Sequence, residues 1–319
     1  MQWLDQIPAF ANQVLLVVIV YIVKALVTKV SAVEPLHAFA FYCKLLAKKV
    51  SKPNQNTPKQ QVISGTVAVL VTLTPLVVIL WLFADFILVP ELWQAMLLYF
   101  ALGGFGIKAN SLKMAKAIAG QNHYLAKQLA QTMLLRQTAN LSPLGLTKAN
   151  IEAQLLHFLQ QQFVVIILFL CSGGLLALSY RLLLVMHQQW NIKQVNFINF
   201  GLFIHFCINM ITWLPSRVLG AMMLLTSIGQ NFLLKWRLTK GHFFKLNNDF
   251  IIHLFALNVG TVLGGVAMYD ETKVRRASFN ESAKPSEGSD VIHASKQILT
   301  LQLFSTIIIL FFTAITIVS

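Results

Sequence analysis

The sequence predicts an all-α integral membrane protein, a polytopic bundle of about six transmembrane helices with further amphipathic helices at the membrane surface. Three observations support this fold class. Hydrophobic residues make up 56% of the 319 residues and charged residues only 11%, whereas a soluble domain carries about 25% charged residues. The apolar residues gather in runs of about 20, the length that an α-helix needs to cross a bilayer. The basic residues, which give a net charge of +14, are concentrated between these runs.

Six apolar segments are predicted to cross the membrane. The first ends at Lys24 and Lys29, whose long side chains can reach the interface. The second contains Pro75, which is expected to kink it, and the fifth is expected to end at Pro215. The six segments comprise residues 8–30, 62–84, 92–107, 163–180, 195–214 and 298–318.

The remaining segments are expected to lie at the membrane surface or in water. Residues 34–50 and 108–131 have the spacing of amphipathic helices. A polar helix is expected to begin near Thr147 and to run without a break into the fourth span. Residues 250–269 are apolar enough to span, but both flanks are basic and we expect them not to cross. Residues 269–290 are predicted to form a mobile cytoplasmic loop within a single membrane domain, residues 1–319.

The basic residues also predict the topology. Residues 24–61 contain seven Lys or Arg against one acid, and residues 107–150 contain six against none. Basic loops stay in the cytoplasm, so the N-terminus is expected on the outer side of the membrane. The lipid bilayer is therefore the expected partner of the basic loops. Nucleic acid is not expected, because no basic and aromatic recognition module is present.

Catalytic and metal-binding motifs are absent from the sequence. It has no paired acids, nucleophile elbow or Walker loop, and the glycines of residues 103–106 favour close helix packing over phosphate binding. The three cysteines are scattered, and the histidines lack a ligand spacing. The sequence therefore predicts no catalytic residue, no metal site and no cofactor.

Six polar residues are candidates for binding a ligand. Arg217 follows Pro215 at the end of a span, where a guanidinium can hold a phosphate or carboxylate, or anchor to lipid phosphate. His205 and Asn209 are one helical turn apart, so both can point into the helix bundle. The others lie at the boundary of the fourth span or in the polar segment before residue 250: His157, Gln161 and Asn247.

The order of these features resembles the CobD/CbiB family of cobalamin-biosynthesis membrane proteins. The segment ITWLPSRVLG, which contains Arg217, is similar to the family's Pro-Ala-Arg box, and NVGTVLGG is similar to its glycine-rich close. The resemblance implies an amide-forming synthase that joins adenosylcobyric acid to an aminopropanol phosphate with Mg²⁺. Yet His157 stands where the family has a Glu, and residues 160–162 are three glutamines where the family has Ala-Glu-Asn.

The loss of these acids makes the chain more similar to the AmpE branch, which is named for β-lactamase induction. That similarity implies a non-catalytic regulatory or sensory protein of a bacterial inner membrane, which binds a metabolite or protein at its cytoplasmic face. The alternative is a diverged synthase of cobalamin biosynthesis, and only that alternative would require Mg²⁺. The sequence leaves homo-oligomerisation open.

Overall fold

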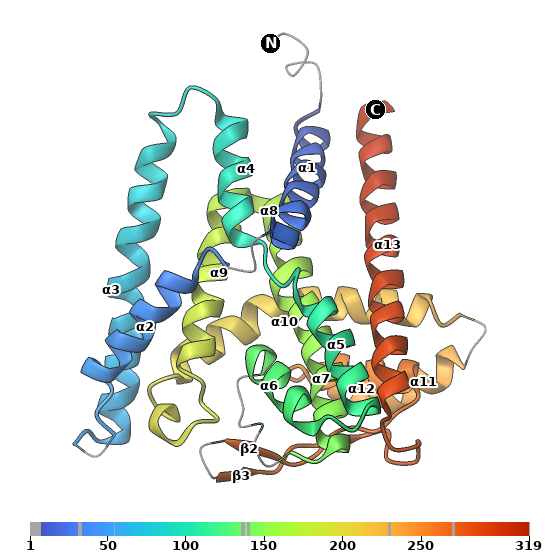
Figure 1. Ribbon diagram of the computed structural model, residues 1–319. Helices are drawn as coiled ribbons and strands as arrows, with labels where there is room; N and C mark the ends of the chain where they lie inside the picture. The colour runs from blue at the N-terminus through green and yellow to red at the C-terminus, as the bar shows by residue number, and fades with distance from the viewer. Residues whose placement is uncertain are drawn as a thin grey trace. The chain divides into compact units, whose positions relative to one another are not determined.

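A computed structural model describes residues 8–30, 34–53, 55–134, 138, 141–228, 231–269 and 272–318 of the chain (Figure 1). Helices account for nearly all of its regular structure, and the strands are two or three residues long. By contact the chain divides into two units. Unit 1 comprises residues 1–105, 160–208 and 306–319, and unit 2 comprises residues 106–159 and 209–305.

Within the described residues, five helices are long and apolar enough to cross a membrane. They are Ala9–Lys29, Pro58–Ala84, Pro143–Ser172, Leu202–Leu225 and Gly288–Ile317. Many of their large apolar side chains are exposed, as lipid-facing side chains must be. The chain is therefore an all-α, multi-pass membrane protein, which confirms the predicted fold class.

Unit 1 is built around α9 (Gly174–Gln189), which packs against its four neighbours (Figure 1). Gln94 Oε1 accepts a hydrogen bond from the Gly174 amide at 2.6 Å. At the other end of α9, Trp190 Nε1 donates to the Cys43 carbonyl at 3.1 Å. The first helix, α1 (Ala9–Val30), packs against two of these neighbours. The neighbours of α9 are α2 (His37–Val50), α3 (Pro58–Ala84), α4 (Pro90–Ala101) and α8 (Val164–Ser172).

Unit 2 contains a packed group of three helices, α5 (Ile107–Ala119), α6 (His123–Met133) and α7 (Pro143–Phe158). Their buried contact is made by Met114, Ala117, Ala126, Ala130 and Leu146.

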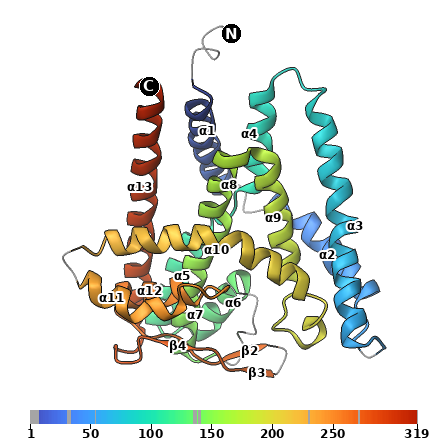
Figure 2. The same cartoon turned by 180° about the vertical axis from the view of Figure 1, so that it is seen from behind.

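The rest of unit 2 pairs helices with short strands. The helices α11 (Phe232–Thr239) and α12 (Asp249–Val259) pack together (Figure 2). Strand β1 (Leu263–Gly264) packs on α7 and α12. Strand β1 pairs antiparallel with β4 (Ser278–Phe279), with Leu263 opposite Phe279. Strand β2 (Ala267–Tyr269) pairs antiparallel with β3 (Thr272–Val274).

Two long helices have residues in both units. They are α10 (Leu202–Leu225) and α13 (Gly288–Val318), whose apolar end confirms the predicted last span. A 3-10 turn, η3 (Val195–Phe197), precedes α10, and another, η4 (Lys240–His242), follows α11.

Three predicted spans differ from the structure. The segment 92–107 forms only the 12-residue α4, about 18 Å long and too short to cross a bilayer. The segment 163–180 is divided at Gly173, whose φ of +82° ends α8. The fifth span does not end at Pro215, because α10 continues to Leu225. Proline is tolerated inside membrane helices, where neighbouring groups satisfy the backbone.

Other segments also begin or end at residues that differ from the prediction. The central helix begins at Pro143 and not near Thr147, because Ser142 Oγ caps it by accepting from the Gly145 amide at 3.1 Å. It continues through a π-helical turn, η2 (Leu159–Phe163), into α8. Residues 250–269 cover all but the first residue of the 11-residue α12 (Asp249–Val259) and then strands. This helix is too short to cross a bilayer, as expected. The predicted loop 269–290 contains strand residues; its mobility stays a prediction, and residues 270 and 271 lie outside the described part.

One close backbone contact in unit 1 gives a test of this packing. A Cβ added at Gly65 on α3 would lie 2.0 Å from the Phe200 carbonyl oxygen. We expect Gly65→Ala to lower the free energy of unfolding by about 1–3 kcal/mol, because backbone must move on one side. Thermal unfolding in detergent measures this change. Gly241→Ala is the control, since a Cβ there meets nothing within 4 Å; equal losses in both variants would contradict the packing.

Candidate functional site

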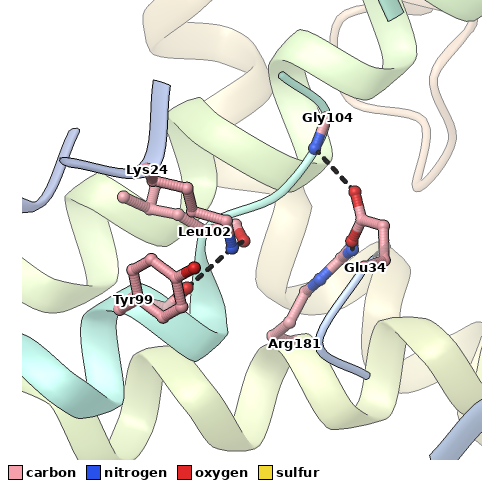
Figure 3. A network of polar contacts seen from close by, with 6 residues as sticks. All are labelled: Lys24, Glu34, Tyr99, Leu102, Gly104 and Arg181. Carbon is pink, nitrogen blue, oxygen red and sulfur yellow. Dashed lines mark hydrogen bonds and ion pairs between the residues drawn. The ribbon is translucent and has the colours of Figure 1, made fainter. Parts of the chain in front are cut away.

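A buried cluster of charged residues forms where α1, α4 and α9 meet the start of α2 (Figure 3). All of its members belong to unit 1. The loop that follows α4 supplies the glycines, α1 and α9 supply the cations, and the residue that precedes the turn into α2 supplies the acid. We call these residues the Arg181 cluster: Lys24, Glu34, Gly103, Gly104 and Arg181.

Lys24 holds the end of α4. Its Nζ donates to the carbonyl oxygens of Leu102 and Tyr99, the latter at 2.6 Å. The ammonium also lies 5.0 Å from the centre of the Tyr99 ring, and the side chain is 5% exposed. A helix end leaves carbonyls without an intrahelical partner, and a cation satisfies them well. Lys24 therefore fixes the point at which the glycine loop begins.

The glycine loop brings its backbone very close to α9 and to the Gln161 turn. The Gly103 amide donates to the Gln161 carbonyl at 3.0 Å. A Cβ on Gly103 would lie 2.6 Å from an Arg181 terminal nitrogen and 2.8 Å from Gln161 Oε1. Gly104 has a φ of +81°, a conformation that favours glycine. The loop thus needs glycine at both positions to pass close to Arg181 in this conformation.

Arg181 and Glu34 form the ion pair of the cluster. An Arg181 terminal nitrogen donates to Glu34 Oε2 at 3.2 Å, and Glu34 Oε1 accepts from the Gly104 amide at 3.4 Å. The two partners differ in exposure, since the Arg181 side chain is 5% exposed and the Glu34 side chain 49%. Guanidinium groups stay charged in proteins. A buried cation is therefore paired with a carboxylate that faces partly into solvent.

Most of the hydrogen-bonding capacity of Arg181 is unused. Neither its Nε nor its other terminal nitrogen has an acceptor among the residues that the structure describes. The Tyr180 hydroxyl is also buried without a partner there. Buried donors of this kind are uncommon and call for a reason. The cluster carries two cations against one acid and can attract a negatively charged group.

The predicted candidates fall into both units. Gln161 is 4% exposed and lies beside the Arg181 cluster through its contact with Gly103. His205 lies 3.1 Å from His187, measured between ring nitrogens, and the two rings stack. Burial lowers the pKa of His187 to about 3, with smaller contributions from His205 and Lys193.

Arg217 and Asn247 meet in unit 2. All five Arg217 N–H donors have acceptors. The Nε donates to the Phe243 carbonyl at 2.7 Å, and one terminal nitrogen donates to the carbonyls of His242 and Lys245. The other terminal nitrogen donates to Ser216 Oγ and to the Asn247 carbonyl. Arg217 therefore organises the loop 242–247, and binding a phosphate would require some of these bonds to break.

Aromatic rings enclose the Arg217 guanidinium. Its carbon lies 5.3 Å from the Trp213 ring centre, 5.8 Å from Phe243 and 5.3 Å from Phe250. Such stacking stabilises a guanidinium that is only 5% exposed.

The last two candidates, His157 and Asn209, are partly buried on α7 and α10 of unit 2. Their ligand role, like that of the other four, stays a prediction.

Sequence reasoning missed the charged residues that the fold brings together. Arg181 carried a usable signal, because it is the single charged residue between Glu152 and Lys193, and an ionisable residue in an apolar run marks a functional site. Glu34 is the one acid in residues 24–61. A second pair was also missed: the buried Glu152 of α7 pairs with Arg276 at 3.0 Å and accepts from the Gly264 amide at 2.8 Å.

The described carboxylates do not fit a Mg²⁺ centre. No three His, Cys, Asp or Glu of the described residues lie close enough together to hold a metal ion. Glu34, Glu152 and Asp290 each form an ion pair with a Lys or Arg. Mg²⁺ prefers carboxylate and water oxygens in octahedral geometry, and these oxygens are already engaged by cations.

Comparison with known proteins gives one family. Residues 17–298 match the family model described as "CobD/Cbib protein". A Cobalamin biosynthesis protein CobD from Chromobacterium violaceum is 26% identical over 205 residues, which is 64% of this chain and 66% of that relative, slightly less than two thirds of it. A protein of the same name from Stutzerimonas stutzeri is 23% identical over 221 residues, 69% of this chain and 73% of the relative. No solved structure matches significantly.

These matches overturn the main functional prediction from the sequence. Both relatives are named for cobalamin biosynthesis, and neither name refers to the AmpE branch. The prediction of a non-catalytic, AmpE-type regulator is therefore wrong. It rested on missing acids, and that loss does not outweigh a family match over most of the chain.

The Arg217 contacts predict a structural effect that is local to unit 2. We expect Arg217→Ala to lower the free energy of unfolding by about 3 kcal/mol, because several carbonyls lose a charged donor. Amide hydrogen exchange should accelerate in residues 242–249. Arg237→Ala, at an exposed arginine of α11, is the matched control. Unchanged exchange in the loop would show that Arg217 does not hold it.

The His187 pKa predicts a loss of stability in acid. The folded-state pKa of about 3 lies below the unfolded value of about 6.5. The unfolded chain therefore takes up a proton first as the pH falls below about 6.5, and the stabilisation is lost between that pH and about 3. The expected slope is up to about 1.4 kcal/mol per pH unit.

Denaturant unfolding at several pH values measures this slope. We expect His187→Gln to flatten it, while His293→Gln, at an exposed histidine, leaves it unchanged. An identical slope in the protein with and without His187 would assign the acid sensitivity to other groups.

Proposed function

The chain belongs to the CobD/CbiB protein family, and on that premise we propose that it acts in cobalamin biosynthesis. The proposed reaction is that of a diverged amide-forming synthase. A nucleoside triphosphate transfers a phosphoryl group to the carboxyl group of adenosylcobyric acid, and the amine of an aminopropanol phosphate then forms the amide as phosphate leaves. The proposed location is a bacterial inner membrane, with the substrates entering from the cytoplasm. Support comes from the family match and from two relatives that carry a cobalamin-biosynthesis name.

The Arg181 cluster is the proposed site of this reaction. The matched range, residues 17–298, includes Lys24, Glu34 and Arg181. Both proposed substrates carry negatively charged groups, and the Arg181 cluster has an excess of positive charge at a buried position. Fixed cations in a site of low dielectric constant bind such groups strongly and stabilise negative charge that develops on a reacting carbonyl oxygen.

The membrane-embedded fold suits a large amphipathic substrate. A corrinoid presents apolar edges together with charged and amide side groups, and unit 1 combines lipid-facing helices with a buried cationic cluster. We propose that this combination holds the substrate at the membrane surface, while Arg181 orients the charged end. Orientation of two reactants can itself supply a large share of a rate enhancement.

Complementation tests the proposal. The chain is expressed in a bacterium that lacks its amide synthase and needs cobalamin for growth on minimal medium. We expect growth, together with the amide product in cell extracts by mass spectrometry. Arg181→Gln should reduce both by at least about tenfold, because one lost charged contact is worth about 1.5–3 kcal/mol.

Arg237→Gln is the matched control and should leave growth unchanged, since Arg237 is exposed on α11. Membrane levels of each variant are measured by immunoblot. Failure of the unsubstituted chain to restore growth or product at a normal membrane level would refute the proposed function.

A further inference from the structure

Arg181 has N–H donors that its ion pair with Glu34 does not use. Arg181 is 4% exposed, and among the described residues its guanidinium donates to Glu34 Oε2 at 3.2 Å. Its Nε and one terminal nitrogen are buried without an acceptor in the described part of the chain. A carboxylate that fully matched an arginine would accept two parallel bonds. Glu34 makes one, so it satisfies the guanidinium poorly.

Glu34 also holds the Gly104 amide weakly. The distance of 3.4 Å from that amide to Oε1 lies at the long end of the hydrogen-bond range. The Glu34 side chain is 49% exposed, and it belongs to no helix, since α2 begins at His37. An exposed carboxylate can leave its partner at small cost, because water solvates it. The acid is therefore the movable member of the ion pair and Arg181 the fixed one.

The fixed members are held rigidly. Gly103 leaves no room for a Cβ against Arg181, so the loop and the guanidinium are in direct contact. Lys24 ties α1 to the end of α4 and interacts electrostatically with both Glu34 and Arg181. The other described acids of unit 1 outside the cluster are Asp85, which caps α3, and Glu91, in the first turn of α4. Glu91 lies at the opposite end of α4 from the glycine loop, about 15 Å away along the helix.

We propose that Arg181 and the Gly104 amide form a binding site for a phosphate group, and that Glu34 occupies this site until a phosphate displaces it. A tetrahedral phosphate has more acceptor oxygens than a carboxylate, so it can use the N–H groups that Glu34 leaves unmatched. The positive charge of Lys24 adds to the attraction. The displaced Glu34 carboxylate moves into water, and the charge of Arg181 stays paired throughout.

This inference rests on the proposed function only for the identity of the natural ligand. A phosphorylated soluble substrate and the headgroup of a membrane lipid share the same chemistry. The site itself can be measured with inorganic phosphate, independently of any activity.

The test measures phosphate binding to the purified full chain in a neutral detergent by isothermal titration calorimetry. We expect weak binding by the unsubstituted chain. Glu34→Gln removes the competing charge and should tighten the dissociation constant by about tenfold or more, a change of about 1.4 kcal/mol. Glu91→Gln, an acid on the same unit but outside the cluster, should bind phosphate as the unsubstituted chain does.

A double variant, Glu34→Gln with Arg181→Gln, removes both charges and so leaves no buried charge without a partner. It should fold, by thermal unfolding, and lose phosphate binding. Phosphate should also raise the melting temperature of the Glu34→Gln protein more than that of the unsubstituted chain. The inference is overturned if the double variant binds phosphate as well as Glu34→Gln alone. It is also overturned if Glu34→Gln binds phosphate no more tightly than the unsubstituted chain and phosphatidic acid gives no stabilisation that requires Arg181.

A second arm identifies the source of the phosphate. The Glu34→Gln chain and the double variant are placed in nanodiscs of phosphatidylcholine with or without phosphatidic acid. A gain in melting temperature from phosphatidic acid that requires Arg181, without binding of inorganic phosphate, assigns the site to a lipid headgroup. Binding of inorganic phosphate assigns it to a soluble ligand, and the absence of both refutes the site. The complementation test of the proposed function does not depend on these titrations. The proposed function and the phosphate site can therefore be refuted separately.

Discussion

A buried guanidinium is the constraint on which unit 1 depends. Arg181 stays charged at 4% exposure, and a buried charge without a partner costs several kcal/mol. Its environment follows from that cost. Gly103 has no side chain because one would collide with the guanidinium, and Gly104 takes a left-handed conformation and donates its amide to Glu34. Glu34, which precedes the turn into α2, supplies the compensating charge. One residue of α9 thereby links α2 and the end of α4.

Arg217 shows how the same side chain is surrounded when the fold supplies an acceptor for each of its donors. Five acceptors take its five N–H donors, and three aromatic rings surround its guanidinium. Nothing of that guanidinium is left over for a ligand without rearrangement of the loop. Arg181 has one acceptor and a partner that faces solvent. The contrast between a saturated and an unsaturated buried arginine is the physical basis for placing the ligand site at Arg181.

Some of the chain's few acids form ion pairs that hold the fold together. The sequence has eleven acids among 319 residues, and three of the described ones, Glu34, Glu152 and Asp290, are paired with Lys or Arg. Glu152 is buried in unit 2 and fixes Arg276 and the Gly264 amide, so it stabilises the contact between α7 and β1. The remaining basic excess can bind anionic groups, a property that fits the negatively charged substrates of the proposed reaction and anionic lipid.

The sequence by itself determined the class of the protein. Low charge, long apolar runs and basic loops fixed an all-α, multi-pass membrane fold, because a helix in lipid must be apolar over its own length, which is a local property. It also predicted the turn at residues 103–106 as a place of close packing, and the structure gives Gly103 that role. The tertiary structure alone decided which residues meet. Glu34 and Arg181 are 147 positions apart and Glu152 and Arg276 are 124 apart, and their pairing depends on how separate helices pack. The saturation of Arg217 likewise depends on a loop 25 to 30 residues further along the chain, so its position beside Pro215 could not show that its donors were already taken.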